Sequence, residues 1–159
     1  MKNTFLIILL TLLVSCKSKN RNDIEILSKF SDDMFLKQKP IEDVLLKYSI
    51  LNKKDFEQDT SILIGYCQEI NEDYRISIKN NNNKFKIVKA NDSSLKNGII
   101  LRKKEKAYLL KTDIHLNIMV IDSTSKITSY FIDPFYTKGN SKPYKPAYLK
   151  DMINLKIEQ

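Results

Sequence analysis

The clearest hydrophobic pattern begins shortly after the first twenty residues. Apolar residues recur there at the three- and four-residue spacing of one helix face, which predicts a helix over 23–37. A second helix is predicted from Pro40, because the residues after it repeat that spacing. Its apolar face is formed by Ile41, Val44, Leu45 and Tyr48. Residues 49–60 are mostly polar and are predicted to form a loop.

From residue 61 onward the pattern changes to short runs rich in β-branched and aromatic residues. Such runs, with alternating apolar and polar positions in several of them, are typical of strands. The predicted strands span 61–70, 74–79, 84–90, 98–104, 106–114, 115–122 and 126–133. The four asparagines at 80–83 are predicted to form a turn, since Asn tolerates left-handed backbone. Weak helical spacing over 148–157 suits either a closing helix or a final strand.

Helices followed by consecutive strands predict an α+β domain. Short connections between neighbouring strands favour antiparallel pairing. We therefore expect two N-terminal helices packed on a curved antiparallel sheet of about five or six strands. This order of elements is similar to that of the cystatin-like and nuclear-transport-factor-2-like folds. The likeness is one of topology and implies no function.

The first sixteen residues have a different character. A short start carrying Lys2 precedes an apolar run from Phe5 to Val14, in which Thr11 is the only polar residue. As a helix this run would span about 15 Å, whereas a membrane span needs about 20 residues. A basic start followed by a short apolar run is the layout of a secretory signal peptide.

The run ends on Leu13-Val14-Ser15-Cys16, which resembles the lipobox of bacterial lipoproteins. The resemblance implies cleavage between Ser15 and Cys16, and a diacylglyceryl group on the Cys16 thiol. On this interpretation 1–15 is a lipoprotein signal peptide, 16–22 is the lipidated Cys with a flexible tether, and 23–159 is one domain. More than one acyl chain would hold the chain stably on the membrane. The alternatives are an ordinary cleaved signal peptide and an uncleaved hydrophobic anchor.

The residues after Cys16 indicate which bacterial membrane the lipoprotein would be sorted to. Lys17 stands where an Asp retains many Gram-negative lipoproteins at the inner membrane. The tether is basic up to Asp23, unlike the acidic run that directs some lipoproteins to the cell surface. We therefore expect the periplasmic face of the outer membrane of a Gram-negative bacterium, with a Gram-positive source left open.

The net charge of +8 comes almost entirely from lysine. Only Arg21, Arg75 and Arg102 among the 27 basic residues are arginines, the residue whose planar fork reads phosphate and guanine. The lysines are scattered and no base-reading motif is present. A solvated basic surface explains the charge best, attraction to anionic lipid or polymer comes next, and a nucleic-acid partner is not expected.

The candidate catalytic and metal-binding residues all have ordinary structural explanations. His115, the only histidine, has no ligand partners at zinc spacing, and Cys67 lies inside an apolar run where a thiol is usually a buried hydrophobe. The acids lack the spacing of a calcium loop, and the glycines build no phosphate loop. The acids are Asp32, Asp33, Asp55, Glu57 and Asp59, and the glycines are Gly65, Gly98 and Gly139. We expect no catalytic residue, no metal and no cofactor.

The most suggestive segment for recognition is the loop over 133–148. It combines prolines with aromatic residues and lysines, which suits a surface that binds peptide, glycan or anionic polymer. The alternative is a long connection whose aromatics pack over an open end of the sheet. The candidate binding residues are Phe135, Tyr136, Lys138, Lys142, Tyr144, Lys145 and Tyr148.

Together these features predict a membrane-anchored cell-envelope lipoprotein that acts as a binding or interaction module without catalysis. Its partners would be the membrane, through Cys16, and an envelope protein, peptide or glycan. Its site would be the concave face of the sheet or the 133–148 loop. Two alternatives are an envelope enzyme with a non-standard site, and an inhibitor or immunity-type protein.

Overall fold

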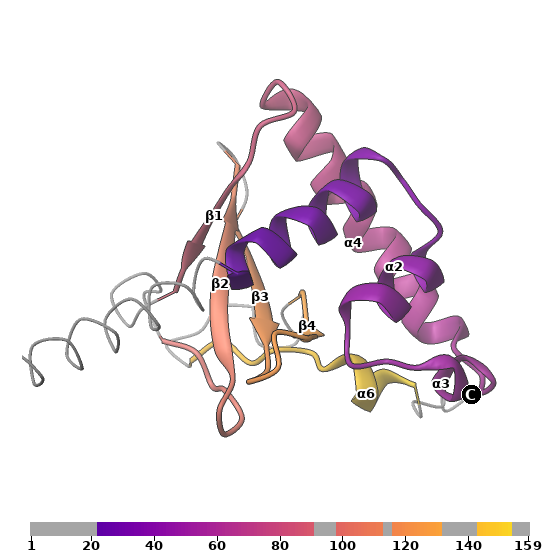
Figure 1. Cartoon of the computed structure of the whole chain (residues 1–159). Helices are drawn as coiled ribbons and strands as arrows, with labels where there is room; N and C mark the ends of the chain where they lie inside the picture. The colour runs from indigo at the N-terminus through magenta and orange to yellow at the C-terminus, as the bar shows by residue number, and fades with distance from the viewer. Residues whose placement is uncertain (1–21, 91–97, 113–115, 132–142, 154–159) are drawn as a thin grey trace, which may run out of the picture.

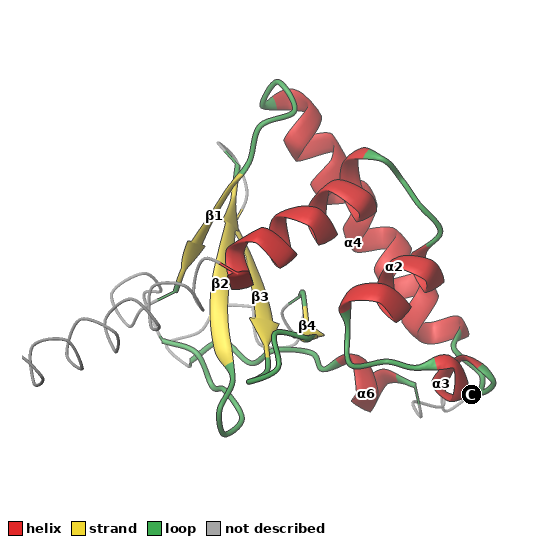
Figure 2. Ribbon diagram, in the orientation of Figure 1, coloured by secondary structure: helices red, strands yellow, loops and turns green. Residues whose placement is uncertain are grey.

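The computed structural model describes residues 22–90, 98–112, 116–131 and 143–153. In these residues helices lie on one side of an antiparallel sheet, which confirms the predicted α+β class (Figures 1 and 2). The helical segments are 22–31, the π-helix η1 (Asp32–Leu36), α2 (Ile41–Tyr48), α3 (Lys53–Phe56), α4 (Ser61–Asn80) and α6 (Leu149–Met152). The strands are β1 (Lys86–Lys89), β2 (Lys106–Lys111), β3 (Leu116–Ile121) and β4 (Ile127–Ser129).

The sheet is a simple meander in the order β1-β2-β3-β4, with every neighbouring pair antiparallel. Lys89 pairs with Tyr108, and Tyr108 pairs in turn with Met119. The strands predicted over 84–90, 106–114, 115–122 and 126–133 are confirmed as shorter strands, and their expected antiparallel pairing is correct. Within the described residues the predicted final segment is helical, as α6.

The strands predicted over 61–70 and 74–79 are wrong, because both runs belong to the single helix α4. Its buried residues Leu63, Cys67, Asn71 and Ile78 recur every four or seven positions, which is one helix face. The alternation read over 74–79 places Ile76 beside Ile78, but Ile76 is 51% exposed while Ile78 is fully buried. Helical packing therefore overrides the β propensity of isoleucine here.

The prediction of five or six strands and two helices fails for the same reason. The described part of the chain has four strands in its sheet, and more helices than two. The strand predicted over 98–104 is also wrong, since Ile99 makes only an isolated parallel bridge to Tyr144. The predicted loop over 49–60 contains the short helix α3, which begins with a capping box between Asn52 and Asp55.

The predicted N-terminal helices are confirmed. Residues 22–31 are helical and continue into η1, and α2 follows Pro40, which occupies its N-cap. The predicted apolar face is buried at Leu27, Phe30 and Met34. Helix 22–31, drawn in indigo, lies over the sheet, and α2 and α4 lie beyond it (Figure 1).

The core fills the space between the helices and the inner face of the sheet. Tyr108, Leu110 and Met119 point into it from β2 and β3. A smaller cluster on the outer face includes Leu109 and Val120. The inner face is therefore occupied by packed side chains and is no open concave site, contrary to the expectation from sequence. Among the residues described, no helix has the length and apolarity needed to cross a membrane.

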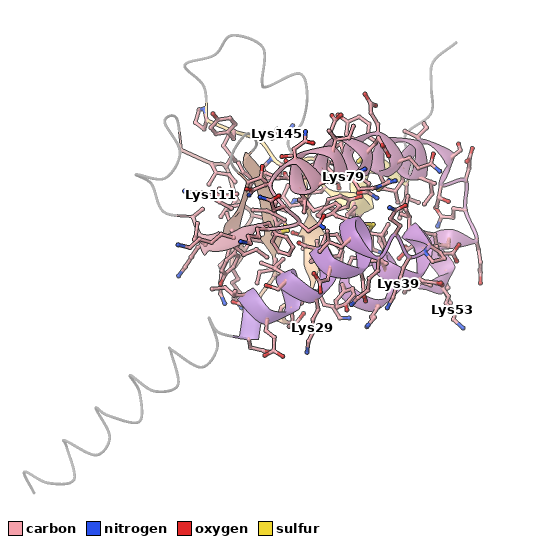
Figure 3. The ribbon with its side chains drawn as sticks, turned by 90° about the horizontal axis from the view of Figure 1, so that it is seen from above. Lys29, Lys39, Lys53, Lys79, Lys111 and Lys145 are labelled. Atoms are coloured by element: carbon pink, nitrogen blue, oxygen red, sulfur yellow. The ribbon has the colours of Figure 1, made fainter. Side chains whose placement is uncertain are left out.

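The lysines are spread over the surface instead of gathering on one face. Figure 3 labels six of them, each on a different segment of the chain. They are Lys29, Lys39, Lys53, Lys79, Lys111 and Lys145. This distribution fits the expectation of a solvated basic surface better than a docking site for a polyanion.

Candidate functional site

A groove runs along helix α4 and is closed on its other side by η1, residues 37–40 and the start of α2. It has a volume of about 590 Å³ and is named here the α4 groove. Its lining residues are Met34, Gln38, Lys39, Pro40, Ile41, Glu42, Ile64, Gln68, Asn71, Glu72 and Arg75. A smaller hollow of about 370 Å³ continues it toward Lys79 and shares Gln38, Glu72 and Arg75 with it.

The α4 wall follows from the spacing of residues along that helix. Ile64, Gln68, Asn71 and Arg75 lie three or four positions apart, so they share one face. This face borders the buried stripe of α4, and Asn71 belongs to both. The groove therefore has a polar rim and an inward-facing amide at its base.

The opposite wall has an unusual backbone. The π-helix η1 precedes Gln38, which has a φ of 51°, in the left-handed region that non-glycine residues rarely adopt. π-turns occur often at functional sites, and left-handed non-glycine residues persist where the surroundings enforce them. Pro40 then restricts the backbone at the start of α2. The wall is thus held in one shape.

A carboxylate cluster holds this wall in place. Asp33 accepts hydrogen bonds from Tyr48 at 2.9 Å and Lys47 at 3.2 Å, and forms ion pairs with Lys39 at 3.0 Å and Lys37 at 3.4 Å. The hydrogen bond from Lys39 is the main cause that holds the pKa of Asp33 well below its usual range; burial opposes it. Asp33 therefore stays ionised and ties η1 to residues 37–40 and α2.

Two polar atoms at the groove have no hydrogen-bond partner among the described residues. Asn71 is only 3% exposed, and its Oδ1 accepts no hydrogen bond from any described residue. The Arg75 Nε also donates to none of them. The rest of the Arg75 guanidinium is engaged, because Nη1 donates to Gln38 Oε1 at 3.2 Å and Nη2 pairs with Glu72 at 3.0 Å. Arg75 thus bridges the two walls, and its Nε–H has no acceptor within the described ranges.

No protein-family model, curated protein or solved structure matches the chain. The candidate site is therefore identified by its geometry. Buried polar groups without partners are uncommon in native proteins, and two of them lie one helical turn apart in the α4 groove. This arrangement suits binding of a ligand that supplies both a donor and an acceptor.

The other buried carboxylates are structural ion pairs. Burial raises the pKa of Asp23, but hydrogen bonds from Lys106, Ser125 and Tyr108 outweigh it and lower the pKa overall. Burial also raises the pKa of Asp55, but the hydrogen bonds from Lys150 and from the Asn52 backbone outweigh it. The pKa of Asp55 is therefore lowered overall. A general acid needs a raised pKa, so neither carboxylate is suited to that role. Within the described ranges no cluster of three His, Cys, Asp or Glu side chains could hold a metal ion.

The residues predicted for the 133–148 loop divide into two groups. Phe135, Tyr136, Lys138 and Lys142 lie outside the described residues, as do Ser15 and Cys16. Tyr144, Lys145 and Tyr148 are described.

The described end of this loop packs against residues 98–102. Tyr144 exchanges backbone hydrogen bonds with Gly98 and Ile100 and covers the outer cluster of the sheet. Tyr148 is buried, its ring lies 3.6 Å from the Arg102 guanidinium, and its hydroxyl donates to Glu105 at 2.6 Å. Lys145 lines a separate groove of about 530 Å³. Tyr148 is thus held by Arg102 and Glu105, and it lines that same groove.

The pair of Cys67 and His115 is not brought together in the described structure, since His115 lies outside it. Cys67 itself is fully buried on α4, and burial raises the pKa of its thiol to about 12. A buried, protonated thiol is a poor nucleophile. Cys67 therefore has the structural role expected from sequence.

This burial predicts an unreactive thiol. In a Cys16→Ala chain Cys67 is the remaining cysteine. Iodoacetamide at pH 8 should alkylate it at least about a hundredfold more slowly in the native protein than in urea, because the thiolate is suppressed and shielded. Mass spectrometry of timed samples measures both rates. Equal rates would show that Cys67 is accessible.

Sequence reasoning missed the α4 groove because it assigned α4 to strands. The polar residues Gln68, Asn71 and Arg75 have no common face in a strand, yet they share one in a helix. A helical reading of 61–80 would have placed them together. No sequence signal indicates the left-handed Gln38 that forms the opposite wall.

Proposed function

We propose that this protein is a lipid-anchored cell-envelope protein whose domain binds a ligand in the α4 groove without catalysis. The membrane attachment would be the acylated Cys16, on the periplasmic face of the outer membrane of a Gram-negative bacterium. The tether over 16–22 would connect it to the domain. The ligand would belong to the envelope.

The sequence Leu13-Val14-Ser15-Cys16 supports the anchoring. A leader this short is too small to span a bilayer, so cleavage and acylation at Cys16 explain both its length and its ending.

The α4 groove supports the binding role, and it is the observation that carries it. Its walls are fixed by the Asp33 cluster and by the packing of α4, so the site is largely pre-formed. The unpartnered atoms of Asn71 and Arg75 provide places for specific hydrogen bonds. The buried carboxylates Asp23, Asp33 and Asp55 are all held ionised by lysines, which favours binding over acid–base chemistry.

The anchoring predicts that Cys16→Ala abolishes incorporation of labelled palmitate and releases the protein from membranes. The measurement is metabolic labelling of a Gram-negative host that expresses the full chain, followed by separation of inner and outer membranes. The unsubstituted chain should carry label and fractionate with the outer membrane.

The matched control is Cys67→Ala, which removes the other cysteine. Because Cys67 is buried in the domain, this variant should keep the full palmitate signal. Absence of label on the unsubstituted chain, or retention of label by Cys16→Ala, would show that Cys16 is not the anchor.

A further inference from the structure

We propose that the α4 groove takes an extended peptide segment, whose backbone amide groups pair with Asn71 and Arg75. This inference rests on the groove being the ligand site of the proposed function. It adds the chemical class of the ligand and the residue that selects it.

Asn71 carries a buried acceptor that the free domain leaves without a partner among the described residues. An Asn side chain has two acceptor sites and two donor hydrogens, yet Asn71 Oδ1 is buried with no partner among the described residues. A buried polar group left unpaired costs about 1–3 kcal/mol. An apolar side chain of similar shape would avoid that cost. An amide at this position is therefore explained by a partner that the free domain lacks.

Arg75 provides a hydrogen-bond donor close to Asn71. Arg75 Nε has no acceptor in the described structure and lies one helical turn from Asn71, about 6 Å along the axis. A ligand that satisfies both residues must carry N–H and C=O groups at spacings of a few ångströms. An extended peptide repeats this pair at every residue, about 3.3 Å apart.

Both free atoms are closed to solvent, so a small side-chain movement accompanies binding. The carboxamide torsion of Asn71 is broad and roughly two-fold, and its rotation presents either the oxygen or the amide nitrogen to the groove. Arg75 can turn its Nε edge while Nη2 keeps Glu72, because Arg75 is one third exposed. The ligand amide then replaces the missing partners.

The charges of the groove disfavour an anionic ligand. Lys39 is paired with Asp33, and Arg75 is paired with Glu72. Glu42 adds a further negative charge to the rim. The groove therefore has no surplus of positive charge to bind a phosphate or an acidic polymer.

The size and floor of the groove set the length of the peptide. From Ile64 to Arg75 it follows three turns of α4, about 16 Å, which is about five extended residues. Met34, Ile41 and Ile64 provide an apolar floor for alternate side chains. The hydrogen bond from Arg75 to Gln38 crosses the groove and marks the end of this length of about 16 Å along α4.

The test uses a fluorescein-labelled, capped pentapeptide of alternating leucine and alanine, titrated with the full processed chain in detergent and followed by anisotropy. A second series replaces each backbone amide in turn with an ester, which removes one N–H and keeps the apolar side chains. We expect saturable binding of the parent peptide, and at least a tenfold weaker Kd for one or more of the esters. Esters partition into micelles as well as the parent does, so detergent binding cannot produce this difference.

The protein variants separate recognition from folding. Asn71→Leu should weaken the Kd of the parent peptide at least tenfold while its Tm stays equal to that of the unsubstituted protein or rises, because a purely structural Asn would lower it. Asn80→Leu is the matched control, since it makes the same change at an exposed position of α4 that does not line the groove. It should change the Kd less than threefold.

Three results would overturn the proposal. They are no saturable binding of the parent peptide, an unchanged Kd in Asn71→Leu, or unchanged Kd values throughout the ester series. If Asn71→Leu does not fold, the ester series decides alone. Failure of peptide binding with normal palmitate labelling of Cys16 would remove the ligand class and leave the anchoring intact. Loss of palmitate labelling with normal peptide binding would remove the anchoring at Cys16 and leave the peptide ligand intact.

Discussion

Replacing Asp23 with alanine should lower the free energy of unfolding by about 3–5 kcal/mol. Asp23 is fully buried and accepts hydrogen bonds from Lys106 Nζ at 2.6 Å, Tyr108 at 2.9 Å and Ser125 at 2.5 Å. Without the carboxylate, Lys106 loses its counter-ion and two buried hydroxyls lose their acceptor. Urea denaturation at neutral pH measures the difference.

The control for this prediction is Asp73→Asn, which alters an exposed carboxylate on α4. Surface substitutions of this kind change stability by less than about 0.5 kcal/mol. A similar loss in both variants would mean that net charge, and not the Asp23 cluster, determines the effect.

The pH dependence has a definite sign. The folded pKa of Asp23 is lowered, so its carboxylate stabilises the fold at pH values above its unfolded pKa, about 3.9. This contribution is lost as the pH falls from there toward the folded pKa. The stability difference between the unsubstituted protein and Asp23→Asn should therefore be complete at pH 6 and shrink below about pH 4. A difference that stays constant down to pH 3 would contradict the ion pair.

Replacing Phe30 with alanine should lower the free energy of unfolding by about 3–5 kcal/mol. The ring is fully buried at the centre of the core and meets Phe35, Tyr48 and Tyr130 edge-on, at centroid distances of 6.1, 6.0 and 5.2 Å. Truncation removes the apolar burial, leaves a cavity and breaks three aromatic contacts. Since small domains are stable by about 5–15 kcal/mol, the variant should be close to unfolding at 37 °C.

Two companion variants make the Phe30 result interpretable. Phe30→Leu keeps most of the volume and should cost clearly less than alanine. Ile76→Ala removes an isoleucine that is half exposed and should change stability by less than about 1 kcal/mol. Thermal unfolding followed by circular dichroism ranks all three. A Phe30→Ala variant as stable as Ile76→Ala would disprove the central role of this ring.

The N-terminal helices and the meander were predictable because each has one buried side with a clear period. Leu27, Phe30 and Met34 repeat at helical spacing, and the strands from β2 onward follow one another through short connections. Helix α4 was not predictable in this way, because over short stretches its isoleucines fit both the helical period of 3.6 residues and the strand period of two. In a strand Ile76 and Ile78 would share one face, but Ile76 is exposed and Ile78 is buried, as the helical period requires.

The candidate site was less predictable than the fold. Asn71 is an ordinary polar residue in the sequence, and its burial follows from the packing of α4 against η1. Gln38 likewise has left-handed backbone just after the π-helix η1, and neither feature has a sequence signature. The composition of the 133–148 loop predicts a binding surface, yet its Tyr148 is buried beneath the Arg102 guanidinium. A ligand groove of this kind depends on tertiary contacts that a local pattern does not contain.

The Asp23 cluster also has a mechanical consequence for an anchored protein. A lipid at Cys16 would transmit force to Asp23 through seven residues, which span at most about 25 Å when fully extended. The hydrogen bonds of Asp23 would carry this force to Lys106 and Tyr108 on β2, and to Ser125 in the turn before β4. A force applied through these residues would thus be shared between the first helix, strand β2 and the turn before β4. The first described turn of this helix is thus fixed to the sheet through its buried carboxylate.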